Sequence, residues 1–323
     1  MKPDLLHVVA VVSNPVRFGR RAELFRHFID HMLASGVRLT VVELAYGDRD
    51  FDIAPREGVN IVQLRTRDEL WHKENLINAG VQRLPPDWKY VAWVDGDVTF
   101  TNPDWATQTV DQLQHYDVVQ LFDFAEDVGL APHQHLNIER GFVHRYHAML
   151  RECAAGGTTP TPPHGKHPYG GWFGHCGYAW AMRRSAWNKL GGLFDLGILG
   201  SGDHHMACAL VGAVQSSVPV KVSLAYRKHL ALWEARARRH IVQNIGYVPG
   251  KLLHHFHGPK AQRQYVERWQ ILLRNDFDPE TDLKRDWQGL WSLTGNKPQL
   301  RDELRLYFRQ RNEDSNDLGG VRA

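Results

Sequence analysis

The chain has 323 residues, of which 43 % are hydrophobic and 23 % charged, with 39 Lys and Arg against 36 Asp and Glu. This composition is typical of a globular protein and excludes an intrinsically disordered one, and the length allows one large domain or two modest ones. The nearly balanced net charge of +3 gives no sign of a nucleic-acid or membrane partner.

The sequence shows no targeting or membrane signal. It has no run of about 18 apolar residues, so no membrane-spanning helix is expected. Its first residues lack the charged start, apolar centre and cleavage site of a secretory signal. Cys153, Cys176 and Cys208 are odd in number and lack a CxxC spacing, which favours reduced thiols over a disulfide framework. We therefore expect a cytoplasmic protein, of a bacterium or of a cell infected by a virus.

The first 120 residues alternate between short apolar runs and segments with helical spacing. Strands are predicted at 5–12, 37–44, 59–64 and 90–94. Helices are predicted at 20–34, from Asp68 as a cap to 83, and from 102 to about 116. This alternation implies an α/β fold with a mixed, mostly parallel central sheet flanked by helices.

Sheets of this kind bind ligands beyond the carboxyl ends of their strands. In this sequence the residues expected at that rim are 14–17, Glu43, 65–68 and 95–97.

The second half of the chain is less regular. Proline, glycine and histidine between about 126 and 171 leave no clear period and predict a long loop, either a functional lid or a disordered segment. Regularity returns with a strand at 177–182, a short helix at 185–190 and a helix after Gly202. A last helix is predicted at 300–309, followed by a disordered end.

The sharpest motif is Asp95-Gly96-Asp97, directly after the apolar strand at 90–94. Two carboxylates one residue apart can reach into one crevice, and the glycine allows the chain to bend and a ligand to approach. Oxygen ligands suit Mg²⁺ or Mn²⁺, which usually share their coordination sphere with phosphates. The alternative is a solvated Asp-Gly turn.

Two predicted helix starts carry further charged residues. Lys73, in the segment WHKENLIN, would meet an anionic ligand at a helix N-terminus, or else lie with Glu74 on a solvated face. Asp203 follows glycines in GSGDHH and is placed either to act as a general base or to cap the helix.

Histidines cluster in HHFHGPK, residues 254–260. On an extended chain, His255 and His257 would share one face, opposite His254 and Phe256. Because no CxxC or HExxH accompanies them, we expect no closed zinc site. A single histidine joining a carboxylate pair on Mn²⁺ is compatible with that ion's preferences.

In combination, residues 5–268 resemble GT-A-type glycosyltransferases that use nucleotide sugars. The segments that carry the resemblance are VVAVVSNP, WHKENLIN, YVAWVDGDVTF and GYAWAMRRSAWNKLGGLFD. It implies a GT-A, Rossmann-like catalytic domain over residues 1–270, with a nucleotide-binding half at 1–125 and an acceptor half at 126–270. Residues 271–323 would form a helical extension with a disordered end.

The resemblance also implies residue roles in an inverting hexosyltransferase. Asp203, in LGSGDHH, takes the place of the family's catalytic base, although the acid that commonly precedes it is missing. As in galactosyl- and N-acetylgalactosaminyltransferases, Mn²⁺ or Mg²⁺ would be held by Asp95, Asp97 and His257, with His255 in reserve. A nucleotide diphosphate sugar, by family analogy a UDP-sugar, would contact Asn14, Pro15, Arg17, Glu43, Asp68, Lys73, Asp95, Gly171, Trp172 and Gly174.

Other functions remain open at this stage. A nucleotide-sugar hydrolase or a nucleotidyltransferase would use the same metal-bound diphosphate, and a non-catalytic sugar- or nucleotide-binding relic would keep the cleft without turnover. The acceptor would be a glycan, a small molecule or a hydroxymethylated base in DNA. The basic stretch at 236–240 is compatible with DNA, although such stretches are usually just solvated.

Overall fold

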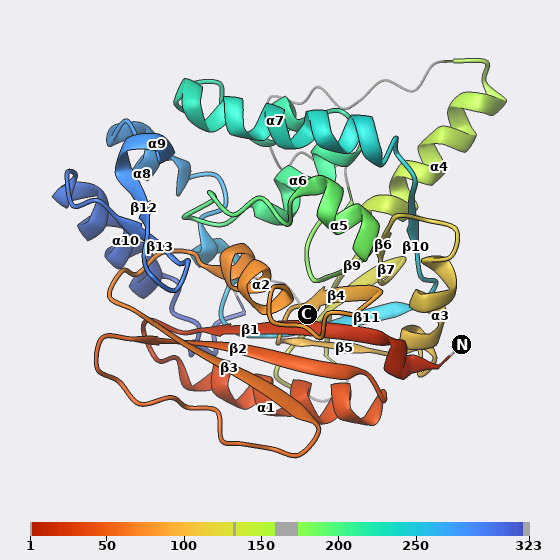
Figure 1. Ribbon diagram of the computed structural model, residues 1–323, viewed down its shortest axis with the longest axis horizontal. Coiled ribbons are helices and arrows are strands. Elements are labelled where there is room, and N and C mark those ends of the chain that lie inside the picture. Colours follow the sequence, from red (N-terminus) through yellow and green to blue (C-terminus); the bar gives the residue numbers. More distant parts are fainter. Residues whose placement is uncertain (1, 132–133, 159–173, 319–323) are drawn as a thin grey trace.

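The computed structural model describes residues 2–131, 134–158 and 174–318, and its centre is a seven-stranded sheet (Figure 1). The strand order is β10-β6-β9-β4-β1-β2-β3. These strands are β1 (Leu6–Ser13), β2 (Arg38–Tyr46), β3 (Val59–Thr66), β4 (Tyr90–Val94), β6 (Val118–Gln120), β9 (Ala179–Arg183) and β10 (Ile245–Tyr247). β9 is antiparallel to β4 and β6, and the other neighbours are parallel. The predicted α/β fold with a mixed, mostly parallel sheet is confirmed.

Helices cover both faces of the sheet because successive side chains of its strands point to opposite sides. In β1, Val8 and Ala10 pack with α1 (Gly19–Ala34) and α3 (Trp105–Gln112). Val9 points to the other face, into a cluster with side chains of several further helices. Among them are α2 (Lys73–Val81), α5 (Arg184–Leu190), α6 (Gly202–Leu210) and α7 (Leu224–His240).

A second sheet, of order β5-β11-β7-β8, brings the histidine segment to the acidic motif. Its strands are β5 (Val98–Phe100), β11 (Lys251–His255), β7 (Phe124–Val128) and β8 (His135–Arg140). β11 lies between β5, to which it is antiparallel, and β7, to which it is parallel. At its end, the backbone N–H of His255 donates to the carbonyl of Asp97 at 2.9 Å.

The prediction of one long loop at 126–171 is wrong for much of its described part. β7 and β8 form a hairpin there, followed by α4 (Phe142–Ala155). α4 buries Phe142, Val143, Tyr146 and Met149 at helical spacing. The pattern was missed because histidines and arginines separate these positions and because β8 is an edge strand with little buried surface.

The C-terminal part adds further elements to the same core. These are the short helices η2 (Val214–Ser217), η3 (Lys260–Arg263), α8 (Trp269–Arg274) and α9 (Pro279–Asp282), the pair β12 (Leu283–Arg285) and β13 (Trp291–Leu293), and α10 (Pro298–Gln310). At the other end of the chain, η1 (Pro3–Leu5) precedes β1. α10 confirms the last predicted helix, and it buries Leu300, Leu304, Tyr307 and Phe308.

Of the predicted disordered end, residues 311–318 lie within the described chain and contact α1 through Asp314, whereas 319–323 lie outside it. The three cysteines are free thiols. Across the described segments, no helix combines the length and apolarity needed to cross a bilayer.

Candidate functional site

A cavity of about 940 Å³ lies beyond the carboxyl ends of β1 and β4. It gathers segments that are far apart in the sequence. The predicted site residues in its lining are Asn14, Pro15, Lys73, Asp95, Asp97, Gly174, Asp203 and His257. The rim expected for a parallel sheet is therefore where these side chains meet.

Three side chains in this lining converge at one point. Oδ2 of Asp97 lies 2.8 Å from Nε2 of His257 and 3.9 Å from Nε2 of His254. The potential ligand atoms of the three residues lie within 4.8 Å of one another. Oδ1 of Asp97 is buried and has no hydrogen-bond partner among the described residues. A carboxylate with two imidazoles is a donor set that Mn²⁺ accepts, so these residues fit a divalent cation.

Each histidine of this group is held through its other ring nitrogen. Nδ1 of His254 lies 2.7 Å from Oδ1 of Asp127, and Nδ1 of His257 lies 3.3 Å from Oε2 of Glu313. Because an ionised carboxylate only accepts, each Nδ1 carries a proton, and each Nε2 is turned toward Asp97. Burial would raise the pKa of Asp127, but His254 and the ammonium of Lys260 lower it, so it is ionised.

Arg263 supplies a positive charge at the same point. Its Nη2 lies 2.9 Å from Nε2 of His257. Burial works to raise the pKa of Asp97, but His257, His254 and Arg263 outweigh it and lower that pKa. Asp97 is therefore an anion held against several positively charged or polar donors.

Asp95 has a different partner, since its Oδ1 lies 2.5 Å from Nζ of Lys73. Burial, opposed by Lys73, raises the pKa of Asp95 to about 6. Lys73 is only 15 % exposed and Glu74 is buried, so the solvated helix face is excluded. Burial favours a lower pKa for Lys73, but Asp95, Asp203 and Glu74 raise it and keep the ammonium charged.

Asp203 lies in the first turn of α6, one residue inside the helix. Ser201, with φ of 74°, occupies the position before the helix, so Asp203 is not its cap. Oδ1 of Asp203 accepts from the backbone N–H of His204 at 2.8 Å. Burial would raise the pKa of Asp203, but Lys73 and that N–H lower it. The side chain is thus an ionised carboxylate in the cavity wall.

The turn after β1 is held by Asn14 itself. Its side-chain amide donates to the carbonyl of Phe18 at 2.9 Å and accepts from the Phe18 N–H at 3.0 Å. Pro15 lines the cavity beside it, and its carbonyl accepts from Arg49. Arg17, with φ of 65°, faces solvent and pairs with Asp52 at 3.7 Å.

Two predicted nucleotide contacts lie behind the cavity wall. Among the described lining residues, neither Glu43 nor Asp68 is present. Glu43 is buried and accepts the backbone N–H groups of Asp52 and Ile53, two residues that do line the cavity. It therefore holds a wall segment in place.

Asp68 does not cap α2, which begins at Lys73, so that prediction is wrong. Its Oδ2 accepts from the backbone N–H of Leu293 at 3.1 Å. This partner in β13 is 225 residues away, and local sequence does not show it.

The predicted register of the histidine segment is also wrong. β11 ends at His255, and Gly258 then turns the chain with φ of 82°. As a result His254 and His257 converge, whereas Nε2 of His255 lies 2.8 Å from Oγ1 of Thr99. Gly171 and Trp172, the predicted donor-sugar contacts, lie outside the described residues.

Gly96 is required for packing. A Cβ at this position would overlap the ring of Phe25, with Cε2 at 2.7 Å. The glycine of the acidic motif therefore lets α1 approach the end of β4. The residues that sequence reasoning did not assign are His254, Arg263, Asp127 and Glu313, and only the HHFHG cluster gave a signal for any of them.

No protein-family model and no curated protein matches the sequence. Among solved structures, TarS from S. aureus is 13 % identical, with 65 % of this chain and 56 % of that chain covered and a TM-score of 0.37. Drosophila β1,4-galactosyltransferase 7, solved with manganese, UDP-Gal and xylobiose, is 14 % identical, with 64 % and 61 % covered and a TM-score of 0.33.

A third structure is glucosyl-3-phosphoglycerate synthase from Mycobacterium tuberculosis, in complex with Mn²⁺, UDP and phosphoglyceric acid. It is 13 % identical, with 84 % of this chain and 75 % of that chain covered and a TM-score of 0.38. This chain thus covers less than two thirds of the length of the TarS and β1,4-galactosyltransferase 7 chains.

Proposed function

We propose that this chain is a GT-A-type glycosyltransferase that moves a hexose from a UDP-sugar to an acceptor hydroxyl with inversion. The observation that supports it best is that one cavity contains both the Asp97, His254 and His257 group and the ionised carboxylate of Asp203. The first is suited to a divalent cation and the second to proton removal.

The residues that would hold Mn²⁺ or Mg²⁺ are Asp97, His254 and His257. When bound, such a cation supplies positive charge against the diphosphate that leaves with the nucleotide. Lys73 adds a fixed ammonium at the rim, because its pair with Asp95 restrains it there. Asp95 therefore acts on the donor through Lys73.

Asp203 takes the proton of the acceptor hydroxyl in this mechanism. Its low pKa keeps it unprotonated at neutral pH, ready to accept a hydrogen bond from the attacking group. Attack from the side opposite the departing diphosphate is a single displacement, so the anomeric centre inverts. Gly177 leaves the space in which Oδ2 of Asp203 sits.

The donor's nucleoside half is proposed to lie at the turn of Asn14, Pro15 and Arg17, with Glu43 shaping the wall behind it. Asp68 remains a proposed base or ribose contact, and Gly171 and Trp172 proposed sugar contacts. The division into a nucleotide half (1–125), an acceptor half (126–270) and an extension (271–323) is part of this proposal. So is a cytoplasmic location, where UDP-sugars and reduced thiols occur together.

The test is product formation with purified protein. Candidate UDP-sugars and Mn²⁺ are incubated with and without acceptors (oligosaccharides, small alcohols and duplex DNA carrying hydroxymethylated bases), and products are identified by mass spectrometry. We expect transfer by the wild type and a loss of roughly 10²-fold or more in Asp203→Asn with donor binding retained. Asp302→Asn, on the exposed side of α10, is the matched control.

Other outcomes would contradict the proposal. Release of free sugar without transfer to any acceptor would identify a hydrolase. Tight donor binding without turnover would identify a non-catalytic relic. Retention of the anomeric configuration, or full activity of Asp203→Asn, would exclude the assigned base.

A further inference from the structure

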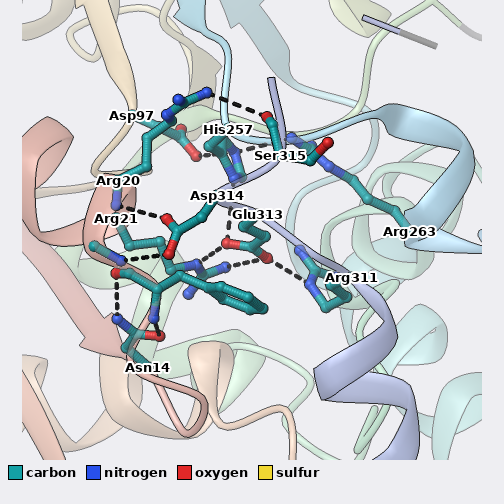
Figure 2. A network of polar contacts seen from close by, with 12 residues as sticks. Asn14, Arg20, Arg21, Asp97, His257, Arg263, Arg311, Glu313, Asp314 and Ser315 are labelled. Carbon is teal, nitrogen blue, oxygen red and sulfur yellow. Dashed lines mark hydrogen bonds and ion pairs between the residues drawn. The ribbon is translucent and has the colours of Figure 1, made fainter. Parts of the chain in front are cut away.

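The chain returns to the metal-binding group after α10. We call residues 311–317 the C-terminal strap, and Figure 2 shows its polar contacts with α1 and His257. Asp314 accepts from the backbone N–H groups of Gly19 at 3.0 Å and Arg20 at 2.8 Å. The side chain of Arg20 donates to the carbonyl of Ser315 at 3.3 Å. These contacts fix the strap across the start of α1.

Glu313 points from the strap into the protein and is 1 % exposed. Its Oε1 accepts from Nε of Arg311 at 2.6 Å, and its Oε2 accepts from Nε of Arg21. The same Oε2 faces Nδ1 of His257 at 3.3 Å. Burial would raise the pKa of Glu313, but Arg21 and Arg311 lower it well below its usual range. The group facing His257 is therefore a carboxylate that only accepts hydrogen bonds.

The two ring nitrogens of His257 have different neighbours. Glu313 accepts from Nδ1. Nε2 lies 2.8 Å from Oδ2 of Asp97 and 2.9 Å from Nη2 of Arg263 (Figure 2). Nδ1 is therefore held by Glu313, and Nε2 is the ring atom turned toward Asp97.

The neighbouring histidine has the same arrangement. Asp127 accepts from Nδ1 of His254, so its Nε2 also faces Asp97. Asp127 comes from β7 in the second sheet, whereas Glu313 comes from the strap. Gly258 makes room for the strap, because a Cβ there would lie 2.8 Å from the carbonyl oxygen of Asn312.

We propose that Glu313 is a positioning residue of the cation site, which holds His257 through Nδ1 so that Nε2 is directed at the metal position beside Asp97. The C-terminal strap is thus part of the active site. This inference rests on the cation assigned under the proposed function. Carboxylates behind metal-binding histidines typically change metal affinity about 10–100-fold.

The variant Glu313→Gln tests this role with little change in size. Both oxygens of Glu313 face arginines, Oε1 Arg311 and Oε2 Arg21, so in either orientation the glutamine NH₂ replaces one acceptor. The amide also removes the negative charge that faces Nδ1 of His257, so the ring is held less firmly toward the metal position. Asp314→Asn is the matched control, because it removes one charge from the same strap at a side chain that bonds Gly19 and Arg20.

The readout is binding of MnCl₂ alone to the full chain, measured by titration calorimetry. We expect Glu313→Gln to bind Mn²⁺ about 10–100-fold more weakly than the wild type and Asp314→Asn to stay within about 3-fold. Equal affinity of Glu313→Gln and the wild type, or an equal loss in Asp314→Asn, would overturn the positioning role. Absence of Mn²⁺ binding by the folded wild type would instead overturn the assigned cation, and this inference with it.

A second measurement does not depend on the variant's stability. The ¹⁵N chemical shifts of the His257 ring in the metal-free wild type report which nitrogen carries the proton. We expect a protonated Nδ1, because Glu313 accepts from it. An unprotonated Nδ1 would overturn the proposal even if Glu313→Gln does not fold.

Discussion

Lys73 and Asp95 form an ion pair, with 2.5 Å between Nζ and Oδ1, that joins the start of α2 to the end of β4. The pair separates the two acids of the Asp95-Gly96-Asp97 motif. Asp95 is neutralised by a cation of the chain itself, whereas Asp97 faces two imidazoles and keeps one buried oxygen without a hydrogen bond among the described residues. The one-residue spacing places both acids at the same rim of the sheet, but each acid contacts different side chains.

This division predicts different effects of two matched substitutions. We expect Asp97→Asn to lose Mn²⁺ binding, because the amide removes the anion between His254 and His257. Asp95→Asn should keep Mn²⁺ affinity within about 3-fold, since its partner is Lys73. Titration calorimetry of both variants measures the difference. A comparable loss in Asp95→Asn would make Asp95 a metal ligand, as the sequence predicts.

The position of Asp203 depends on the absence of a side chain at Gly177. A Cβ on Gly177 would lie 2.7 Å from Oδ2 of Asp203, so Gly177→Ala must displace the carboxylate. We expect kcat to fall about 10-fold or more with little change in donor KM, because misplacing a catalytic group by a fraction of an ångström is costly. In an Asp203→Asn background the same substitution should have almost no further effect on kcat. Additive losses in the double variant would show that Gly177 acts elsewhere.

Glu74 predicts a pH-dependent stability. Burial raises its pKa from 4.5 to about 8 in the folded chain. Between these two values the unfolded chain releases the proton and the folded chain keeps it, so the free energy of unfolding falls as pH rises. Glutamine does not ionise, so the free energy of unfolding of Glu74→Gln does not fall in this way. The difference between the two free energies of unfolding, variant minus wild type, should therefore increase from pH 4.5 to pH 8 by on the order of a few kcal/mol. Urea unfolding at several pH values checks this, and parallel curves for the two proteins would contradict it.

Gly96 predicts a loss of stability. Gly96→Ala places a methyl group against the ring of Phe25, and overpacking of this kind costs about 1–3 kcal/mol. We expect urea unfolding to show that loss and the double variant Phe25→Leu, Gly96→Ala to recover part of it. If the single variant is as stable as the wild type, the glycine is not needed for packing.

The sequence predicted those parts of the fold in which local pattern and tertiary burial agree. The run 90–94 is apolar throughout because β4 is buried on both faces, and α10 shows its buried positions at helical spacing. The acidic motif and Asp203 were found because glycines and carboxylates stand directly at the ends of such elements.

The remaining site residues depend on contacts that local sequence does not encode. The sequence did not indicate His254 as a metal ligand. The chain changes direction where β11 ends, at His255, and that end is set by pairing with β5 and β7. Glu313 lies 56 residues beyond His257 in a polar tail without a motif. Asp68 looked like a helix cap, but its partner in β13 is a tertiary one.

The contact between Asp314 and α1 joins two segments that are synthesised at different times. Phe18, at the N-cap position of α1, provides no side-chain hydrogen bond within the described chain. The first amides of this helix are instead satisfied by a residue that leaves the ribosome about 295 residues later. Because a missing cap costs about 1 kcal/mol, the start of α1 should fray in the nascent chain until Asp314 has been synthesised.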